Sequence, residues 1–268
     1  MNMLLGYAKL ARSTFYYHTK KKVDKYESVK EEIEKIFIEN EKRYGYRRIM
    51  LALQAEGYVI NHKTVLKLMN EMNIHGKQRM SRYKSYKGEV GIVAPNILNR
   101  EFTALNPYEK LATDVTEFAV CGEKVYFSPV MDLYNREILS YSISKSPNFA
   151  QTREMLDGLF KVLPRSATPL LHSDQGWQYQ MKEYQRRLRE HNITQSMSRK
   201  GNCLDNSCME NFFGRLKVEM SIGESFESAD DFIDKLHKYI YYYNNKRISL
   251  KLKGMSPVQY RTHSRLTV

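Results

Sequence analysis

The sequence predicts an α/β fold in which a small all-helical unit precedes a larger unit built on one mixed β-sheet. Three observations lead to this prediction. Apolar residues recur at helical spacing between about residues 27 and 73, and from Leu111 onwards they alternate with polar residues as in β-strands. After three strand segments, short apolar strands alternate with helical segments, an order typical of a sheet covered by helices.

The length and composition favour a folded protein with more than one unit. At 268 residues the chain exceeds one average domain, and 42% hydrophobic with 12% aromatic residues argues against disorder. No apolar run is long enough to span a membrane, and the N-terminal charges follow a short apolar stretch, the reverse of a secretory signal. The three cysteines include no C-x-x-C pair, so we expect free thiols. We therefore expect a cytoplasmic protein with no membrane partner.

Positive charge is concentrated at the front of the chain. The formal net charge is +13, and residues 1–100 carry 20 Lys and Arg against 10 Asp and Glu. Residues 101–268 carry 23 against 20. Such a basic segment favours a polyanionic partner such as nucleic acid, although a soluble basic surface would give the same composition.

The basic front segment contains the pattern of a helix-turn-helix. After a basic lead-in over residues 1–25, residues 26–76 predict three short helices, the first ending at about Asn40. The second ends at Gly57, and the third follows Asn61, a residue type that caps helix N-termini. This pattern is typical of the DNA-binding motif, and a plain three-helix bundle is the alternative. The basic residues that favour DNA contact are Arg43, Arg47, Arg48, Lys63 and Lys67.

The rest of the chain predicts a linker followed by the sheet and its helices. Residues 77–106 are basic, polar and without period, so we expect a linker there. Strands are expected in LATDVTEFAV, EKVYFSPVMDLY, REILSYSIS, TPLLHSD and NITQSM, and Tyr134 to Arg136 join the second and third as a hairpin. Helices are expected over about residues 148–163, 183–191, 208–220 and 230–245.

Three acidic residues occupy positions where a carboxylate needs an explanation. Asp114 lies inside the apolar strand LATDVTEF, where an acid is costly unless it is paired or bound to a metal ion. Asp174 follows the strand PLLHS at its carboxyl end, where α/β sheets place ligands. Glu210 lies in the helix SCMENFFGRLKVEM, on a face that it shares with Lys217. A strand middle, a strand end and a helix can converge on one point, although surface or salt-bridged carboxylates remain the alternative.

Converging carboxylates suit a site for two divalent ions. Their negative charges would raise one another's pKa values unless cations lie between them. Oxygen ligands favour Mg²⁺ or Mn²⁺ over zinc, and two such ions roughly 3.5–4 Å apart can activate a water or a 3′-hydroxyl for attack on a phosphodiester. The sequence contains no GxxxxGK[ST] phosphate loop, so nucleotide hydrolysis is not indicated.

Five ordered motifs follow the basic segment: TDVTEF, DLYNREILSYSIS, HSDQGWQYQ, SMSRKGNCLDNSCMENFFGRLKVE and YYNNKRISLKLKGMSPVQY. Together they resemble the integrase-type core of the IS-three family transposases, specifically their second-reading-frame (OrfB-type) product. The 35 residues between Asp174 and Glu210 match the spacing of the family's DDE signature, and Lys217 occupies its basic position. The similarity covers about residues 26–262, and YGYRRIMLALQAEGYVINHKTV resembles the helix-turn-helix that precedes this core.

The resemblance implies a ribonuclease-H-like catalytic core over residues 107–225, with a C-terminal helix and tail over residues 226–268 packed on it. It implies that Asp114, Asp174 and Glu210 hold two Mg²⁺ or Mn²⁺ ions, and that Lys217 contacts a terminal phosphate of the element end. The implied activity is bacterial DNA transposition, with 3′-end nicking and strand transfer on double-stranded DNA, at insertion-sequence ends and target sites. The implied assembly is a homo-oligomer on DNA, associated with the nucleoid when bound.

The sequence also departs from related proteins. It lacks the zinc-binding His/Cys domain of retroviral integrases, and it lacks the segment of the family's first-frame (OrfA-type) product, which carries another helix-turn-helix and a leucine zipper. We therefore expect this chain to work fused to, or associated with, that product.

Two other functions would share part of this sequence pattern. A ribonuclease-H or junction-type nuclease would share the metal chemistry, and a non-catalytic DNA-binding remnant of a transposon would share the helix-turn-helix. The basic helix-turn-helix and the motif set argue against the nuclease, and the intact acids argue against the non-catalytic remnant.

Four residues near the acids are expected to have structural roles. Asp205 and Asn206 are expected as loop and cap residues, His172 as a structural neighbour of the site and Trp177 as a core residue.

Overall fold

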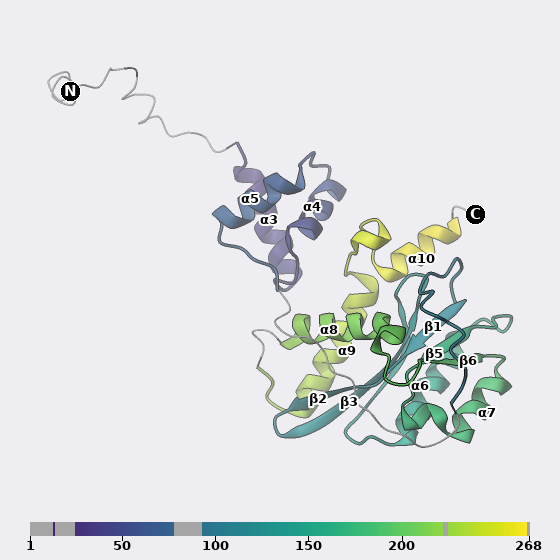
Figure 1. Ribbon diagram of the computed structural model, residues 1–268. Coiled ribbons are helices and arrows are strands. Elements are labelled where there is room, and N and C mark those ends of the chain that lie inside the picture. The colour runs from purple at the N-terminus through teal and green to yellow at the C-terminus, as the bar shows by residue number, and fades with distance from the viewer. Residues whose placement is uncertain (1–12, 14–24, 78–92, 222–224, 267–268) are drawn as a thin grey trace. The chain divides into compact units, whose positions relative to one another are not determined.

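The computed structural model describes residues 13, 25–77, 93–221 and 225–266 (Figure 1). The chain divides into two compact units, Met1–His75 and Gly76–Val268. Nearly all of the expected lead-in of residues 1–25, and residues 78–92 of the expected linker, lie outside the described residues.

Over residues 25–75 the first unit contains three helices, as the sequence predicts: α3 (Glu27–Glu39), α4 (Tyr46–Ala55) and α5 (His62–Glu71). Their apolar stripes form a core that includes Ile33, Ile36, Phe37, Ile49, Leu53, Val65, Leu68 and Met69. Asn61 caps α5, since its Oδ1 accepts a hydrogen bond from the backbone N–H of Lys63 at 2.9 Å. Gly57, in the turn before α5, has a φ of 93°, a left-handed conformation that favours glycine.

One mixed sheet of six strands forms the centre of the second unit. Its strands are β1 (Lys110–Thr113), β2 (Thr116–Val120), β3 (Glu123–Asp132), β4 (Ile138–Ser144), β5 (Leu170–Ser173) and β6 (Thr194–Met197). Strand β3 pairs antiparallel with β1, β2 and β4, and β5 lies parallel between β1 and β6. The predicted α/β class with a mixed sheet is confirmed, and β3 and β4 form the predicted hairpin.

The first predicted strand is interrupted, and Asp114 lies in the break between β1 and β2 rather than in a strand middle. Thr113 is opposite Val130 on β3, and the same register continues into β2. That register places Asp114 opposite Pro129, which has no N–H to donate to the ladder. The Thr113 hydroxyl donates to the Pro129 carbonyl at 2.9 Å. The expectation of an unbroken strand was therefore wrong, because a proline on the facing strand interrupts the pairing.

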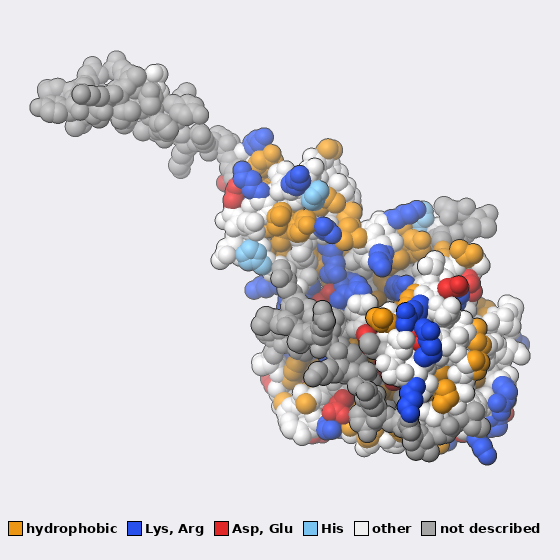
Figure 2. Space-filling view, in the orientation of Figure 1, with side chains coloured by type: hydrophobic (Ala, Val, Ile, Leu, Met, Phe, Trp, Pro, Cys, Tyr) orange, Lys and Arg blue, Asp and Glu red, His pale blue; other side chains and the backbone are white. Residues whose placement is uncertain are grey.

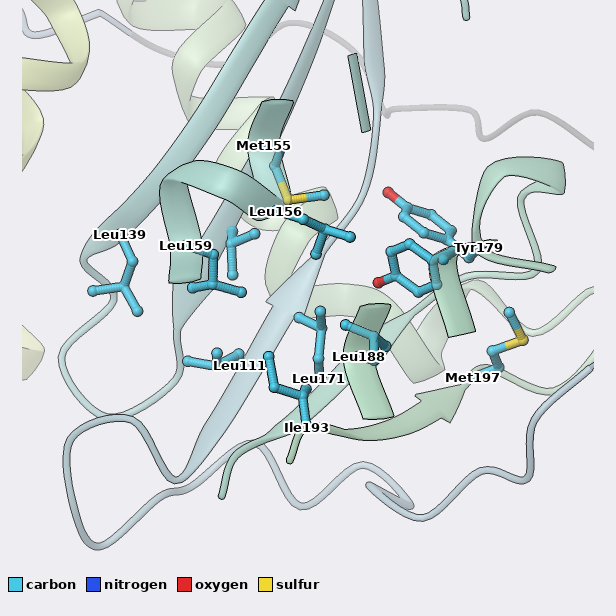
Figure 3. Packing of buried hydrophobic residues seen from close by; sticks show 12 residues of the cluster. Leu111, Leu139, Met155, Leu156, Leu159, Leu171, Tyr179, Leu188, Ile193 and Met197 are labelled. Carbon is cyan, nitrogen blue, oxygen red and sulfur yellow. The ribbon is translucent and has the colours of Figure 1, made fainter. Parts of the chain in front are cut away.

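Helices cover both faces of the sheet (Figure 1). On one face α6 (Phe149–Val162) and α7 (Lys182–Glu190) pack over a cluster of buried side chains from strands and helices (Figure 3). On the other face lie α8 (Ser207–Ser221) and α9 (Ala229–Asn245). There Phe118 of β2 contacts Phe232 of α9, with ring centroids 4.8 Å apart, and Phe127 of β3 lies 6.4 Å from Phe213 of α8. Among the described helices, none has the length and apolar character needed to cross a membrane.

A helix that the sequence pattern did not predict, α10 (Pro257–Leu266), follows α9 after a short helical turn, η3 (Leu250–Leu252). Its Arg261 forms two hydrogen bonds with the Glu137 carboxylate, at 2.7 and 3.0 Å. Asn135 donates from Nδ2 to the carbonyl of Pro257 at 2.9 Å. These contacts attach the C-terminal segment to the turn between β3 and β4, beside the amino end of β1.

The described second half of the expected linker packs against the sheet. Residues 93–106 contain no helix or strand, yet the backbone N–H groups of Ile97 and Leu98 donate to the Ser196 hydroxyl of β6, at 2.9 and 3.1 Å. Leu98 is buried, and the N–H of Met197 donates to the carbonyl of Pro95 at 3.2 Å. The expectation of a linker was therefore wrong for residues 93–106, because their few apolar side chains and their backbone bind the edge strand β6.

Candidate active site and nucleic-acid interface

Asp114 and Asp174 lie side by side at the carboxyl ends of two neighbouring parallel strands. Ala112 of β1 pairs with His172 of β5, and each acid follows two residues further along its own strand. Neighbouring strands lie about 4.8 Å apart, and residues two apart share a face of the sheet. The register therefore brings together two acids that are 60 residues apart in the sequence.

The turn after Asp174 brings Gly176 close to the carboxylate. The Oδ1 atom of Asp174 accepts a hydrogen bond from the backbone N–H of Gly176 at 2.9 Å. A Cβ atom at Gly176 would lie 3.0 Å from this oxygen and 2.6 Å from the side-chain nitrogen of Gln178. A side chain here would move Gln178 and shift the carboxylate by a few tenths of an ångström.

The electrostatics of the pair are unfavourable without a cation. Burial, and next the charge of Asp174, raise the pKa of Asp114 well above its usual value. The hydrogen bond from the Val115 N–H opposes this rise, and the charge of Glu210 adds to it. Burial also raises the pKa of Asp174, against the hydrogen bond from Gly176. A buried carboxylate beside a half-buried one, both with raised pKa values, is an arrangement that a cation would stabilise.

Glu210 lies in the first turn of α8, on the helix that faces Asp114. Buried apolar side chains hold α8 against the sheet, and they are Met209, Phe212, Phe213, Leu216 and Met220. Glu210 itself is half-buried. Within residues 25–77, 93–221 and 225–266, no three or more His, Cys, Asp or Glu side chains are grouped so that they could hold one ion. Asp114 and Asp174 are thus the adjacent pair, and Glu210 acts on Asp114 through its charge.

Lys217 lies two helical turns beyond Glu210 and contacts β2. Its ammonium donates to the carbonyl of Glu117 at 3.2 Å and lies 5.2 Å from the centre of the Phe118 ring. Burial lowers the pKa of Lys217, while Glu117 and Asp114 oppose that change. The lysine therefore lies near the acids, at the edge of the sheet.

His172 and Trp177 take different roles from each other. His172 is buried, with Nδ1 2.8 Å from the Ser196 hydroxyl and Nε2 3.1 Å from the Ser198 hydroxyl, so it is structural, as expected. Burial lowers its pKa to about 4, so it is neutral at pH 7. Trp177 begins the turn η1 (Trp177–Gln180) and is 38% exposed. The expectation of a core tryptophan was wrong, because Tyr179 fills the core position of this turn.

Asp205 and Asn206, which we expected as loop and cap residues, are both buried in η2 (Cys203–Asn206), the turn that leads directly into α8. The signal available in the sequence was an acid between a Gly/Asn-rich loop and an apolar helix, with Arg199 six residues before it. Its other basic partner, Arg100, lies 105 residues away in the sequence.

Of the predicted DNA-contacting residues of the first unit, Arg47, Arg48 and Lys63 lie at the starts of α4 and α5 and Lys67 lies in the middle of α5, whereas Arg43 precedes α4 and is buried. The rings of Tyr46 and His62 are 6.2 Å apart, so these two helix starts are neighbours. Arg47 follows Tyr46 and Lys63 follows His62, and both basic side chains are exposed. Arg48 lies over the Tyr44 ring at 5.4 Å, and Lys67 lies 3.8 Å from Glu71. Lys and Arg side chains are more numerous than Asp and Glu side chains on the surface that Figure 2 shows.

Comparisons with known proteins match both parts of the chain. Two family models described as integrase core domain match residues 104–203 and 210–264, and one described as HTH-like domain matches residues 25–82. The putative transposase InsK for insertion sequence element IS150 of Escherichia coli K12 is 52% identical over 98% of this chain and 94% of its own length. This chain belongs to the IS-three family of transposases. Transposase InsF for IS3A, also from Escherichia coli K12, is 33% identical to it over 84% of this chain and 78% of its own length.

This transposase contains an integrase core domain built on one mixed sheet, and an HTH-like domain precedes it. Among solved structures, the HTLV-2 integrase catalytic core domain in complex with magnesium has a TM-score of 0.43 and 16% identity. That match covers 59% of this chain and 98% of the other. The integrase core domain and the transposase relatives support polynucleotidyl transferase activity.

Proposed function

We propose that this transposase nicks the 3′ end of an insertion sequence and joins it to target DNA, with two divalent ions held by Asp114, Asp174 and Glu210. The observation that carries the proposal is the register that brings Asp114 and Asp174 together at the ends of β1 and β5. Their carboxylate oxygens are the ligand type that Mg²⁺ and Mn²⁺ prefer. Such ions supply activation of an attacking water or 3′-hydroxyl and stabilisation of the leaving oxygen.

The residues around the acids have separate tasks in this proposal. Asp114 and Asp174 present oxygens from a rigid sheet, and Glu210 adds a carboxylate from α8, which packing holds in place. Lys217 is on the same helix and binds a phosphate of the element end. Its ammonium donates to the Glu117 carbonyl, and an ionised phosphate oxygen is a stronger acceptor for an ammonium than a neutral carbonyl.

The first unit supplies the other part of the DNA contact. Arg47, Arg48 and Lys63, at the neighbouring starts of α4 and α5, and Lys67, further along α5, bind backbone phosphates. Phosphate contacts position a protein on DNA without specifying the sequence. The working enzyme is a homo-oligomer on DNA, and the first-frame product adds a second reader through fusion or association.

The test is cleavage and joining of a labelled element-end duplex in the presence of Mg²⁺. Asp114→Asn, Asp174→Asn and Glu210→Gln should each lower the single-turnover rate by at least about 10²-fold, since each removes charge stabilisation from the transition state. The Kd for the same duplex should change by less than about twofold, a difference of roughly 0.4 kcal/mol. Asp157→Asn is the matched control, because Asp157 lies on α6 and pairs with Arg187 at 2.7 Å. It should cleave at the wild-type rate.

The products separate the three candidate functions. Cut and joined DNA from the wild-type protein supports the transposase mechanism. Cut DNA without joining would indicate a nuclease, and tight binding without any cleavage would indicate a non-catalytic remnant. Near-normal activity in any of the three acid variants would remove that acid from the site.

A further inference from the structure

The two residues that lead into α8 join every element that carries one of the acids. Asp205 is fully buried and accepts five hydrogen bonds of 3.0 Å or less. Three come from Arg199, through its backbone N–H, Nε and Nη2, one from Nε of Arg100 and one from Nδ2 of Asn96. Arg199 lies just after β6, and the other two donors lie on residues 93–106, far away in sequence.

Asn206 forms the connection to Asp114. It is buried, and its Nδ2 donates to the carbonyl of Thr113 at 3.3 Å. Thr113 is the last residue of β1, directly before Asp114. Glu210 follows Asn206 by four residues, and residues four apart lie on the same face of a helix. The amide that contacts the end of β1 therefore lies one turn before the acid of α8.

The loop after β6 forms the connection to Asp174. The Ser198 N–H donates to the Ser173 carbonyl at 2.9 Å, and Gln175 Nε2 donates to the Ser198 carbonyl at 3.0 Å. Ser198 thus holds the residues on both sides of Asp174. The next residue, Arg199, is the main partner of Asp205, so one chain of contacts leads from β5 through this loop to the start of α8.

From this network we propose that Asp205 and Asn206 are positioning residues, which set Glu210 against Asp114 and Asp174 by fixing the start of α8 to the sheet. The proposal rests on the proposed function, because it assumes that the three acids act together. Two facts favour positioning over general stability. The contacts converge on one turn rather than spreading over α8, and those made by Asn206 and Arg199 lead to residues beside an acid. The Arg199 and Arg100 side chains are 53% and 42% exposed, so burial of Asp205 serves the loop and not an apolar core.

The experiment compares isosteric variants of the full chain. Asp205→Asn removes the charge that holds both arginines, and Asn206→Asp removes the N–H donor to Thr113. Four quantities are measured: the single-turnover cleavage rate at saturating DNA, Mn²⁺ binding by the DNA-free protein from the free Mn²⁺ spin-resonance signal, the Kd for duplex DNA and the Tm. Changes in the groups that orient metal ligands typically cost 10- to 100-fold in metal affinity or activity, and we expect about this loss in rate and in Mn²⁺ affinity. The Kd for DNA should stay within about twofold, or roughly 0.4 kcal/mol.

Glu137→Gln is the matched control. Glu137 is also buried and paired with an arginine, Arg261, at 2.7 Å. It lies in the turn before β4, beside the amino end of β1, whereas the acids lie at the carboxyl ends of the strands. This variant should lower the Tm while the cleavage rate and Mn²⁺ affinity stay at wild-type values. Arg100→Ala and Arg100→Lys serve if Asp205→Asn does not fold, since Arg100 is partly exposed. The alanine variant should lower the cleavage rate, and the lysine variant should restore part of it.

Three results would overturn the proposal: wild-type rate and Mn²⁺ affinity in both isosteric variants, losses no larger than those of Glu137→Gln, or no difference between Arg100→Ala and wild type. Asp114→Asn in the same assays separates this failure from failure of the proposed function. If Asp114→Asn is inactive while the Asp205 and Asn206 variants are normal, only the positioning role is wrong. If Asp114→Asn cleaves at the wild-type rate, the acid site itself is wrong.

Discussion

The buried ion pair between Glu219 of α8 and Arg247 should show how α8 is held, because removing one partner leaves the other charge in the protein interior. The Glu219 carboxylate accepts from Arg247 Nη2 at 2.6 Å and Nε at 2.8 Å, and also from the Tyr239 hydroxyl at 3.0 Å. Burial lowers the pKa of Arg247, but the Glu219 carboxylate outweighs burial and the net change is a rise. Arginine is not deprotonated in proteins, so Arg247 stays charged when Glu219 is replaced.

The expected loss for Glu219→Gln is about 3–5 kcal/mol, the range measured when one partner of a buried ion pair is removed. For a unit of this size that is a fall in Tm of roughly 6–20 °C. Replacing all three groups, with Glu219→Met, Arg247→Met and Tyr239→Phe together, should recover most of the loss, since apolar groups of similar volume need no partner. The exposed pair of Arg186 and Glu190 supplies the control, and Glu190→Gln should cost less than about 1 kcal/mol.

The assay is urea unfolding followed by the fluorescence of Trp177, which is the only tryptophan and lies in the second unit. The slope of free energy against urea must stay constant across the variants for the comparison to hold. A triple variant as unstable as Glu219→Gln would refute the reasoning. It would show that the pair contributes net stability and that desolvation of the two charges is a minor cost.

Four further predictions follow from the structure. Burial raises the pKa of Asp132 to about 6, against hydrogen bonds from the backbone N–H groups of Tyr134 and Tyr108. The contribution of Asp132 to stability is therefore complete below about pH 4 and is lost as the pH rises through 6. The stability difference between wild type and Asp132→Asn should shift by about 3 kcal/mol between pH 4 and 7, and a constant difference would contradict the raised pKa. After EDTA treatment, Mn²⁺ added at 100 times its Kd should stabilise the wild-type protein by about 2.7 kcal/mol in a thermal-shift assay but should not stabilise Asp114→Asn. Equal thermal shifts in the two proteins would exclude Asp114 as a metal ligand. Arg47→Ala and Lys63→Ala should each flatten the slope of log affinity against log salt by roughly one unit, whereas Lys35→Ala, whose ammonium pairs with Glu32 at 2.7 Å, should leave it unchanged. This chain by itself should prefer element ends over random duplex by less than about tenfold, because Asn61 is used as the cap of α5 and few other side chains there suit base readout. A fusion to the first-frame product should discriminate more strongly between the two DNAs. Strong preference for element ends by the chain alone, measured by competition binding, would contradict this prediction.

Local sequence patterns were sufficient for most helices and for the hairpin. The start of α5 follows from Asn61 and the start of α6 from Asn148, whose side chain accepts a hydrogen bond from the Gln151 N–H at 3.2 Å. Caps and apolar periodicity involve residues within a few positions of one another, so a sequence carries them directly. Helix α10 was missed because its sequence, PVQYRTHSRL, is polar and gives little periodic signal.

The sequence by itself also determined which acids were candidates, through the apolar surroundings of Asp114 and Asp174 and the spacing to Glu210. It did not determine their geometry. Only the tertiary structure decided that parallel pairing of β1 with β5 brings the two aspartates together, and that Pro129 interrupts the strand at Asp114. The same holds for residues 93–106 on β6 and for the partners of Asp205. Each of these features depends on contacts between residues about 15 to 110 positions apart, and such pairings are set by how whole strands and loops pack, which no local pattern records.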